Sequence, residues 1–254
     1  MEANRKLYIF ICGAPRSGTT ACEQLLNTVD KIAVLGERYS GILAKKQPYT
    51  RDLFTKERMA TFKAGDSFWN PLENKKLHDL FVEKYDGCKY VGDKIPTMYE
   101  HYDLISKNFE QAFVIFMSRN ILDVAASYNR RARDVGDKLW SRDQDFTVAL
   151  RDWNRSHDTT VAAAQAYANI TFIGVDYETI FFDETAITRL LKLLDLSPSE
   201  YRIDHDQAKT IFERARRIER ERKDELSSFE KREICRRADF DNYRRARSSI
   251  PWIS

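Results

Sequence analysis

Five short apolar segments place the strongest limit on how this chain can fold. Each is of strand length and rich in β-branched or aromatic residues, and longer stretches with helical periodicity lie between them. The segments are Leu7–Cys12, Ile32–Leu35, Lys89–Val91, Ala112–Met117 and Ile170–Val175. Strands that are apolar throughout and separated by helices are typical of a parallel sheet covered on both faces. The sequence therefore predicts a three-layer α/β fold around a mainly parallel sheet.

The segments between and after the strands predict the helices and the domain organisation. Helical periodicity runs through Thr19–Val29, Ile121–Arg133 and Asp145–Ala168. The chain has 254 residues, of which 43% are hydrophobic, which is enough for a sizeable core. We therefore expect one domain, 1–254, that ends in a charged helical region from about 200 to 254. The apolar stripe of that region is thin and predicts one or two helices.

Charge and cysteine content exclude several classes of protein. A net charge of +3 is far from the excess expected of a dedicated nucleic-acid binder. No apolar run approaches the roughly 20 residues that a membrane-spanning helix needs, and the N-terminal apolar run is interpreted as a strand rather than a targeting segment. The four cysteines show no ligand spacing, which indicates reduced thiols and no metal site. We expect a cytoplasmic protein.

The loop after the first segment is the most informative part of the sequence. The strand ends at Gly13, and the residues Ala-Pro-Arg-Ser-Gly-Thr-Thr follow before a helix begins near Thr19. Such a loop points backbone N–H groups and the positive end of a helix at one place. Gly13 and Gly18 allow close approach of a phosphate, Arg16 supplies a fixed charge, and the hydroxyls add donors. The loop predicts a binding site for a phosphate-like group.

This loop differs from the phosphate loop of nucleotide triphosphatases. That pattern, GxxxxGK[ST], places a lysine directly after its second glycine. Here Thr19 follows Gly18, and the cation stands earlier, at Arg16. An ordinary strand–turn–helix connection is the other interpretation, although such a connection does not require this succession of residues.

The segment Pro15–Thr20 resembles the 5′-phosphosulfate loop of the sulfotransferases that use 3′-phosphoadenosine 5′-phosphosulfate (PAPS). The resemblance implies a P-loop-like sulfotransferase fold and donor binding by Pro15, Arg16, Ser17, Gly18, Thr19 and Thr20. It also implies a second anion site for the 3′-phosphate, with an arginine after a strand and a serine eight positions later. Arg119 and Ser127 stand at that spacing. A helix-start ion pair and a small residue at a helix crossing are the structural alternatives for these two.

Three further residues carry a weaker resemblance to the same family. Tyr177, in the segment Val-Asp-Tyr-Glu after the fifth apolar run, resembles the strand-end tyrosine that lies near the adenine. Core packing is an equal alternative for it. Arg236 and Arg237 are the local candidates for the basic loop that contacts the 3′-phosphate, although the glycine of that loop is absent.

The catalytic candidates follow two of the expected strands. Glu37 comes just after the second strand and shares the carboxyl edge of the sheet with the phosphate loop. The Gly-Glu pair resembles the tyrosylprotein and carbohydrate branches of the family, in which the glutamate is the base. Lys94, in Gly-Asp-Lys-Ile-Pro, resembles the family lysine that neutralises the sulfuryl or leaving oxygen, a role that Arg16 shares. A surface ion pair, with Arg38 for example, is the alternative for Glu37.

Histidine is the other base to weigh, because members that act on phenols and steroids use one. His101 stands seven residues after Lys94 and is the histidine nearest to a motif. We interpret it as a surface residue, and it stays open as the alternative base.

The resemblance predicts sulfuryl transfer from PAPS, with PAP as product, to a hydroxyl or amine of a small-molecule acceptor. The acceptor site is expected from residues 39–69, the loop after Lys94 and residues 130–145, with Phe68–Pro71 as a turn or lid. Its candidate aromatic residues are Tyr39, Tyr49, Phe68, Trp69, Tyr99 and Trp140. A nucleotide-dependent phosphotransferase and a non-catalytic nucleotide-binding module are the alternative functions.

Overall fold

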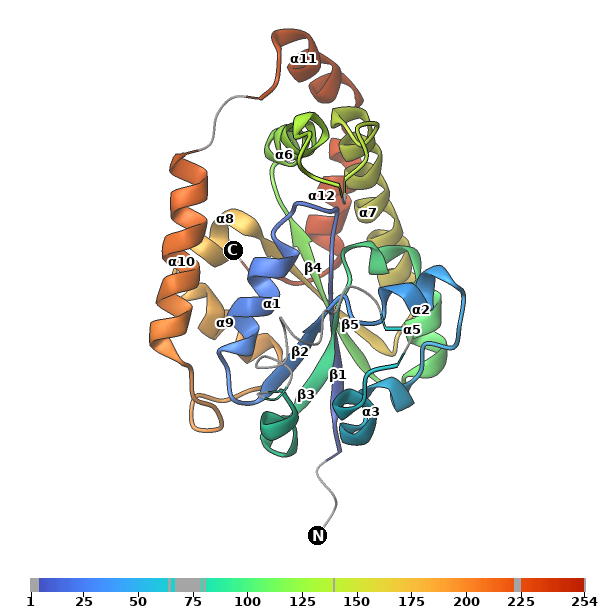
Figure 1. The fold of residues 1–254 in the computed structure, drawn as a ribbon, viewed down its shortest axis with the longest axis vertical. Helices are drawn as coiled ribbons and strands as arrows, with labels where there is room; N and C mark the ends of the chain where they lie inside the picture. Colours follow the sequence, from blue (N-terminus) through green and yellow to red (C-terminus); the bar gives the residue numbers. More distant parts are fainter. Residues whose placement is uncertain are drawn as a thin grey trace.

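The protein is built on a parallel sheet. The computed structural model describes residues 5–63, 65, 66, 79, 81–138, 140–221 and 225–253. Within these residues, six strands lie in the order β2-β3-β1-β4-β5-β6, and every neighbouring pair is parallel (Figure 1). The strands are β1 Leu7–Cys12, β2 Ile32–Gly36, β3 Tyr90–Lys94, β4 Ala112–Ser118, β5 Ile170–Asp176 and β6 Trp252–Ile253. The prediction of a three-layer, mainly parallel α/β fold is confirmed.

Alternate residues of each central strand enter opposite layers, as the pleat of a strand requires. In β1, Ile9 and Ile11 pack into the core beneath α1, while Phe10 and Cys12 pack into the core on the other face. All four side chains are fully buried. Burial on both faces explains why the strands appear in the sequence as continuous apolar runs.

Helices cover both faces of the sheet (Figure 1). The core on one face includes residues of α1 Thr19–Asn27, α8 Tyr177–Phe182, α9 Ala186–Leu193 and α10 His205–Arg220. The core on the other includes residues of α2 Ser40–Ala44, η1 Arg51–Phe54, α3 Lys56–Ala60, η3 Pro96–Glu100, α5 Tyr102–Asn108 and α7 Phe146–Ala166. A third cluster joins α6 Ile121–Arg133 to α7 and to α11 Ser228–Arg237. The short helix η2 is Tyr85–Gly87.

The C-terminal region differs from the expectation of one or two helices. It forms α10, α11 and α12 Phe240–Ser249, and then β6 joins the edge of the sheet beside β5. The side chain of Trp252 covers Gly174, where an added Cβ would lie 2.2 Å from the indole. A two-residue strand leaves almost no periodic signal, and for this reason the sequence did not reveal it.

The predicted third strand proves longer at its C-terminal end than expected. Gly92, Asp93 and Lys94 continue the pairing with β1 and β2. A Cβ at Gly92 would lie 1.6 Å from the carbonyl oxygen of Ile9, so that only glycine allows the two backbones to approach as they do. The apolar pattern did not extend to this part of the strand because Asp93 and Lys94 are charged. Both are buried, and their contacts are with residues of the candidate site rather than with the hydrophobic core.

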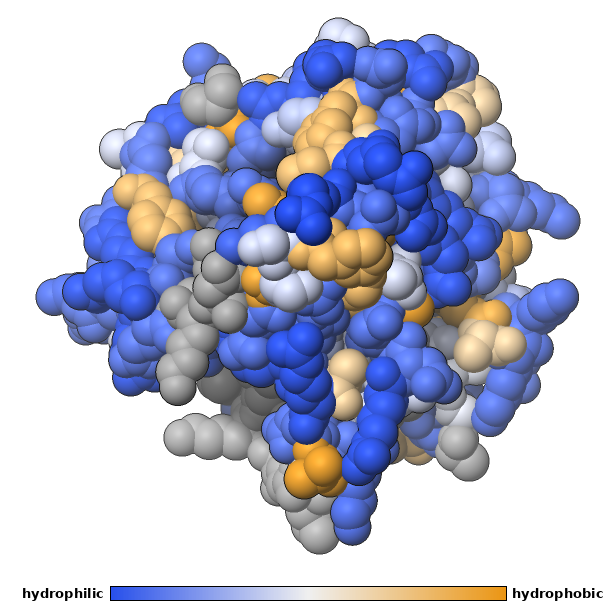
Figure 2. Space-filling view, turned by 90° about the horizontal axis from the view of Figure 1, so that it is seen from above, coloured by the Kyte–Doolittle hydropathy of each residue, from blue (hydrophilic) through white to orange (hydrophobic). Residues whose placement is uncertain are grey.

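The carboxyl ends of the strands meet at one edge of the sheet, and Figure 2 shows the surface of the molecule on that side. Hydrophilic side chains dominate this face, with hydrophobic ones scattered among them. In the described part of the chain, no helix combines the length and apolar character that crossing a membrane demands.

Candidate active site

The loop between β1 and α1 has the backbone of an anion-binding site. Arg16 and Gly18 have positive φ angles of 72° and 94°, on either side of Ser17. Such alternation turns successive N–H groups toward one point. Helix α1 then begins at Thr19 with Gly18 as its N-cap, and neither a side-chain cap nor an acidic residue of its first turn occupies its positive end. The strand, the tight loop and the helix start that the sequence predicts are therefore present from Gly13 to Thr20.

Close packing explains the second glycine of the loop. A Cβ at Gly18 would lie 2.4 Å from the ring of Tyr177. Gly13 is equally confined, since its Cβ would lie 2.2 Å from the carbonyl oxygen of Met117 in β4. The loop is thus fitted against the β4 and β5 ends of the sheet, which bring the second anion-binding motif.

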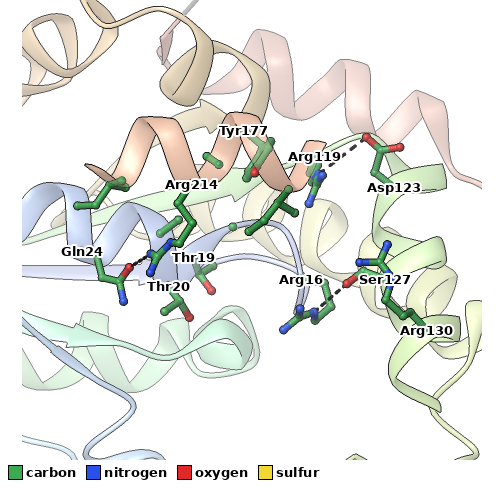
Figure 3. Close-up of a pocket in the computed structure, with 15 residues that line it drawn as sticks. Arg16, Thr19, Thr20, Gln24, Arg119, Asp123, Ser127, Arg130, Tyr177 and Arg214 are labelled. Carbon is green, nitrogen blue, oxygen red and sulfur yellow. Dashed lines mark hydrogen bonds and ion pairs between the residues drawn. The ribbon is translucent and has the colours of Figure 1, made fainter. Parts of the chain in front are cut away.

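The two predicted anion-binding motifs line one cavity (Figure 3). Arg119 follows β4, and Ser127 lies two turns into α6. The Nε atom of Arg16 donates a hydrogen bond of 3.0 Å to Oγ of Ser127. The cavity has a volume of about 420 Å³, within the range of sites for small ligands. Its lining includes Arg16, Gly18, Thr19, Thr20, Arg119, Ser127 and Tyr177.

Positive charge is concentrated around this cavity. Arg16, Arg119, Arg130 and Arg214 line it, and Asp123 is the acidic residue in the lining. Although the Arg16 side chain opens on the cavity, surrounding protein removes water from it, and this desolvation, followed by the charge of Arg131, lowers the pKa of Arg16. Desolvation and mutual repulsion make it unfavourable to hold several arginines together, and an anionic ligand would offset both effects.

Arg119 is almost fully buried and lies over the ring of Tyr177, with its guanidinium carbon 4.0 Å from the ring centroid. Its Nη2 atom donates to Oε2 of Glu219 at 2.7 Å, and its Nε atom lies 3.8 Å from Oδ2 of Asp123. Tyr177 is itself buried, and burial raises its pKa. Tyr177 therefore belongs to the hydrophobic core and also lines the cavity.

Two buried polar atoms of the site have no hydrogen-bond partner among the residues that the structure describes. They are Oγ of Ser17 and Nε of Arg119. Buried polar groups are nearly always satisfied, so each unpaired donor indicates a missing partner. One lies in the phosphate loop and the other at the second motif, and this arrangement fits a ligand with an anionic group at each end.

A buried network supports the strand end that carries Arg119. Nε1 of Trp153 donates to the carbonyl oxygen of Arg119 at 3.0 Å. His157 lies beside it, with Nε2 3.1 Å from Oγ of Ser118 and Nδ1 2.8 Å from the carbonyl oxygen of Trp153. Burial lowers the pKa of His157 to about 4, so the ring is neutral at pH 7. A neutral ring donates to the carbonyl through Nδ1 and accepts from Ser118, and the pair holds the β4 end in place.

The two catalytic candidates are in direct contact. Nζ of Lys94 donates to Oε1 of Glu37 at 2.5 Å and to Oγ1 of Thr20 at 3.0 Å. Lys94 is buried, whereas the Glu37 side chain is about one third exposed. Glu37 has a φ of 58°, a strained conformation for a residue with a side chain. Neither Glu37 nor Lys94 is in the lining of the cavity, but Thr20 is, and its contact with Lys94 connects the pair to the cavity wall.

The alternative in which Glu37 pairs with Arg38 does not hold. Arg38 is fully buried and binds Asp66, at 3.0 Å from Nε, together with the carbonyl oxygens of Met59 and Thr61. Asp93 supports the turn by accepting hydrogen bonds from the backbone N–H groups of Arg38 and Tyr39. Burial raises the pKa of Asp93 to about 7.

The buried carboxyl group of Glu23 lies behind this turn. It is only 6% exposed, and Oε1 accepts a hydrogen bond of 3.1 Å from Nδ2 of Asn27. Burial raises the pKa of Glu23 to about 7, against the opposing effect of Lys94. Three carboxyl groups, Glu23, Glu37 and Asp93, therefore share the surroundings of one lysine.

The structure does not bring Arg236 and Arg237 to the cavity. The Arg236 side chain binds Glu233 at the surface, and Arg237 lines a separate cavity with Thr147 and Asn154. His101, half-buried ahead of α5, is also outside the lining. The arginine that reaches the cavity from the C-terminal region is Arg214 of α10, which contacts Gln24 of α1 (Figure 3).

Helix α10 supplies the part of the site that the sequence analysis missed. Ile211, Arg214, Ala215 and Ile218 face the cavity at intervals of three and four residues. This spacing marks one face of a helix, and it was visible in the sequence as the thin apolar stripe. Nothing in the sequence alone indicated that the stripe covers the phosphate loop.

Three of the four described aromatic residues that were proposed for the acceptor belong to the buried core. Tyr39, Tyr49 and Tyr99 are buried to 98% or more, and Trp140 stacks edge-on against Tyr128. Phe68–Pro71, including Phe68 and Trp69, lies outside the described residues. Across the described ranges, no group of three or more potential metal ligands occurs.

Comparison with known proteins places this site in a family. A model of the sulfotransferase family matches residues 9–200. The chain therefore belongs to the sulfotransferase family, which confirms the resemblance of its motifs.

The chain is similar to protein-tyrosine sulfotransferase 1 from Danio rerio, with 25% identity over 203 residues. The match covers 78% of this chain and 56% of that protein, so the chain spans little more than half the length of this relative. Two solved structures have the same fold. Sulfotransferase STF1 from Mycobacterium tuberculosis H37Rv has 17% identity and a TM-score of 0.50, with 82% of this chain and 71% of that one covered. The sulfotransferase domain of the Synechococcus PCC 7002 olefin synthase has 13% identity and a TM-score of 0.50, with coverage of 96% and 94%.

Proposed function

We propose that this protein transfers a sulfuryl group from PAPS to a hydroxyl or amine of a small-molecule acceptor, and releases PAP. The observation that carries the proposal is the single cavity lined by both anion-binding motifs, in which Arg16 binds Ser127. PAPS is anionic at its 5′ end and at its 3′-phosphate, and each motif matches one of these groups. Ser17 Oγ and Arg119 Nε, which lack a hydrogen-bond partner in the described part of the chain, fit the same sulfuryl donor.

The residues divide between the two ends of the donor. The N–H groups of the loop and the start of α1, together with Arg16, bind the 5′-phosphosulfate. Arg119 and Ser127 bind the 3′-phosphate, with Arg130 beside them. Tyr177, Ile211 and Ile218 supply flat and apolar surface for the adenosine.

Glu37 acts as the base of the reaction. It takes the proton of the acceptor as the acceptor oxygen or nitrogen forms a bond to sulfur, and the bond from sulfur to the bridging oxygen of the 5′-phosphate breaks. Lys94, which also donates to Thr20, holds the carboxylate in position, and Lys94 and Arg16 neutralise the charge that develops on the departing phosphate. The contact between Lys94 and Glu37 supports these roles because it joins base and cation at the edge of the cavity.

The acceptor has a second candidate, the hydroxyl of a tyrosine in a protein. The similarity to a protein-tyrosine sulfotransferase supports it. A panel of phenols, alcohols, amines and tyrosine peptides incubated with labelled PAPS tests the proposal. Transfer to a small molecule supports the proposal. Transfer to tyrosine peptides alone would mean that the acceptor is a protein tyrosine, and the absence of transfer to any compound would indicate a nucleotide-binding module.

A phosphotransferase with an altered phosphate loop is the other enzyme to exclude. The threonine in place of the lysine after Gly18 speaks against it. Titration without magnesium distinguishes the two, since the proposal requires a much higher affinity for PAP than for ATP. We also propose a cytoplasmic location, because the described cysteines are free thiols and three of them are buried.

A further inference from the structure

Arg119, the residue proposed to bind the 3′-phosphate, already binds a carboxylate of the protein itself. Oε2 of Glu219, in the last turn of α10, lies 2.7 Å from its Nη2 atom. Asp123 approaches the same guanidinium from α6, with Oδ2 3.8 Å from Nε. The two carboxylates together exceed the single charge of Arg119, and Arg16 and Arg130 remain as the nearby cations of the cavity.

The atoms involved are those that a phosphate uses. A guanidinium binds phosphate in a bidentate manner through Nε with Nη2, or through Nη1 with Nη2. Nη2 carries two N–H groups, one for each pair, and it donates a hydrogen bond to Glu219. On the Nε–Nη2 face, the other donor is the buried Nε, which lacks a hydrogen-bond partner in the described part of the chain. A phosphate that takes the N–H group bound to Glu219 has to replace Glu219, and a phosphate that binds elsewhere on the guanidinium meets the repulsion of its carboxylate.

Glu219 can leave Arg119 while α10 stays in place. Its side chain is 27% exposed, so a rotation brings the carboxylate into water. Helix α10 is attached separately, through Ile211 and Phe212 in the core and through Arg214 to Gln24 of α1. Exchange of one anion for another therefore does not require α10 to detach from the core.

We infer that Glu219, which lines the cavity adjoining the donor cavity at Arg119, competes with the 3′-phosphate for this guanidinium and sets the affinity and selectivity of the donor site for 3′-phosphorylated nucleotides. This inference rests on the proposed function. A nucleotide with a 3′-phosphate has to displace Glu219 or accept its repulsion, whereas a nucleotide with a 3′-hydroxyl leaves the ion pair intact. Glu219 thus weakens the binding of PAPS and of PAP alike, and the weaker hold on PAP speeds its release.

The test compares two ligands that differ only in the 3′-phosphate, PAP and adenosine 5′-monophosphate (AMP). Calorimetry measures the dissociation constant of each for the wild type, for Glu219→Gln and for Glu213→Gln. Glu213 is an exposed residue of the same helix, and its substitution removes the same charge while it keeps the contact between Glu219 and Arg119. Thermal unfolding of each variant shows that the fold is retained.

The inference predicts that Glu219→Gln binds PAP about tenfold more tightly than the wild type, within the usual range of coupling between two sites. AMP binding changes less than about twofold, and Glu213→Gln resembles the wild type with both ligands. Unchanged or weaker PAP binding by Glu219→Gln would overturn the inference, because Glu219 would then be a neutral neighbour or a support of Arg119. A wild type that binds PAP no better than AMP would instead overturn the proposed donor, and the inference with it.

Discussion

The guanidinium of Arg16 donates a hydrogen bond of 3.0 Å from Nε to Oγ of Ser127, a residue 111 positions further along the chain. The sheet explains this proximity. Strands β1 and β4 are parallel neighbours, so the loop after one lies beside the helix after the other. The contact places the two anion-binding motifs at the distance of one small ligand.

Replacement of Glu37 by glutamine tests the assignment of the base. We expect turnover to fall by at least about a hundredfold, because the amide cannot take the acceptor proton. PAP binding should change less than about twofold, since PAP lacks the sulfuryl group that Glu37 faces. Steady-state kinetics with labelled PAPS and calorimetry with PAP provide the two measurements.

Glu57→Gln is the matched control for this prediction. Glu57 is exposed in the first turn of α3, and its loss should leave both measurements unchanged. Full turnover by Glu37→Gln would assign the base to another residue, and His101 would be tested next.

Replacement of Gly18 by alanine tests the packing of the phosphate loop. The new Cβ would lie 2.4 Å from the ring of Tyr177, at a φ of 94° that alanine tolerates poorly. We expect a loss of roughly 2 kcal/mol or more in the free energy of unfolding, together with weaker PAP binding. Urea denaturation measures the first quantity.

Gly87→Ala is the control, because an added Cβ there meets no atom within 4 Å. It should keep wild-type stability to within about 0.5 kcal/mol. Equal stability of the two variants would show that a Cβ at Gly18 fits beside Tyr177, in contradiction of the structure.

The buried carboxyl group of Glu23 predicts how stability changes with pH. Burial raises its pKa in the folded protein to about 7, from 4.5. The folded state then holds the proton more tightly than the unfolded state, so the contribution of Glu23 to stability is complete below pH 4.5 and is lost as the pH rises to about 7. Glutamine keeps the shape without the charge, and Glu23→Gln should avoid this loss.

The expected advantage of Glu23→Gln over the wild type grows by about 3 kcal/mol between pH 4.5 and pH 8. Urea unfolding of both proteins across this range measures it. A difference that does not vary with pH would mean that Glu23 is ionised at no cost and that its carboxylate has water or a cation beside it.

Much of the fold could be predicted because a sheet that is buried on both faces requires strands that are apolar throughout, and such strands appear in the sequence as apolar runs. Leu7–Cys12 is such a run, and the structure forms a strand over the same residues. The missed features lack this signal. Lys94 continues β3 as a charged residue because its partner is Glu37, and β6 is too short to show a period.

The candidate site could be predicted where its residues follow strands. Arg16, Glu37, Lys94 and Arg119 all stand after or at strand ends, and the parallel sheet gathers such residues at one edge. Arg236 and Arg237 failed to reach the cavity because their position depends on how the C-terminal helices pack, which a local pattern does not encode. The arginine of the C-terminal region that lines the cavity is Arg214 of α10.

The central claim is that one nucleotide is held at both ends, and binding of PAP and AMP to Arg119→Ala tests it most directly. We predict that the wild type binds PAP at least tenfold more tightly than AMP, and that Arg119→Ala removes most of this difference while AMP binding stays within about threefold. Ser127→Ala, a milder change at the same subsite, should remove part of it. Equal weakening of both ligands by Arg119→Ala, or a wild type that does not distinguish them, would contradict the account.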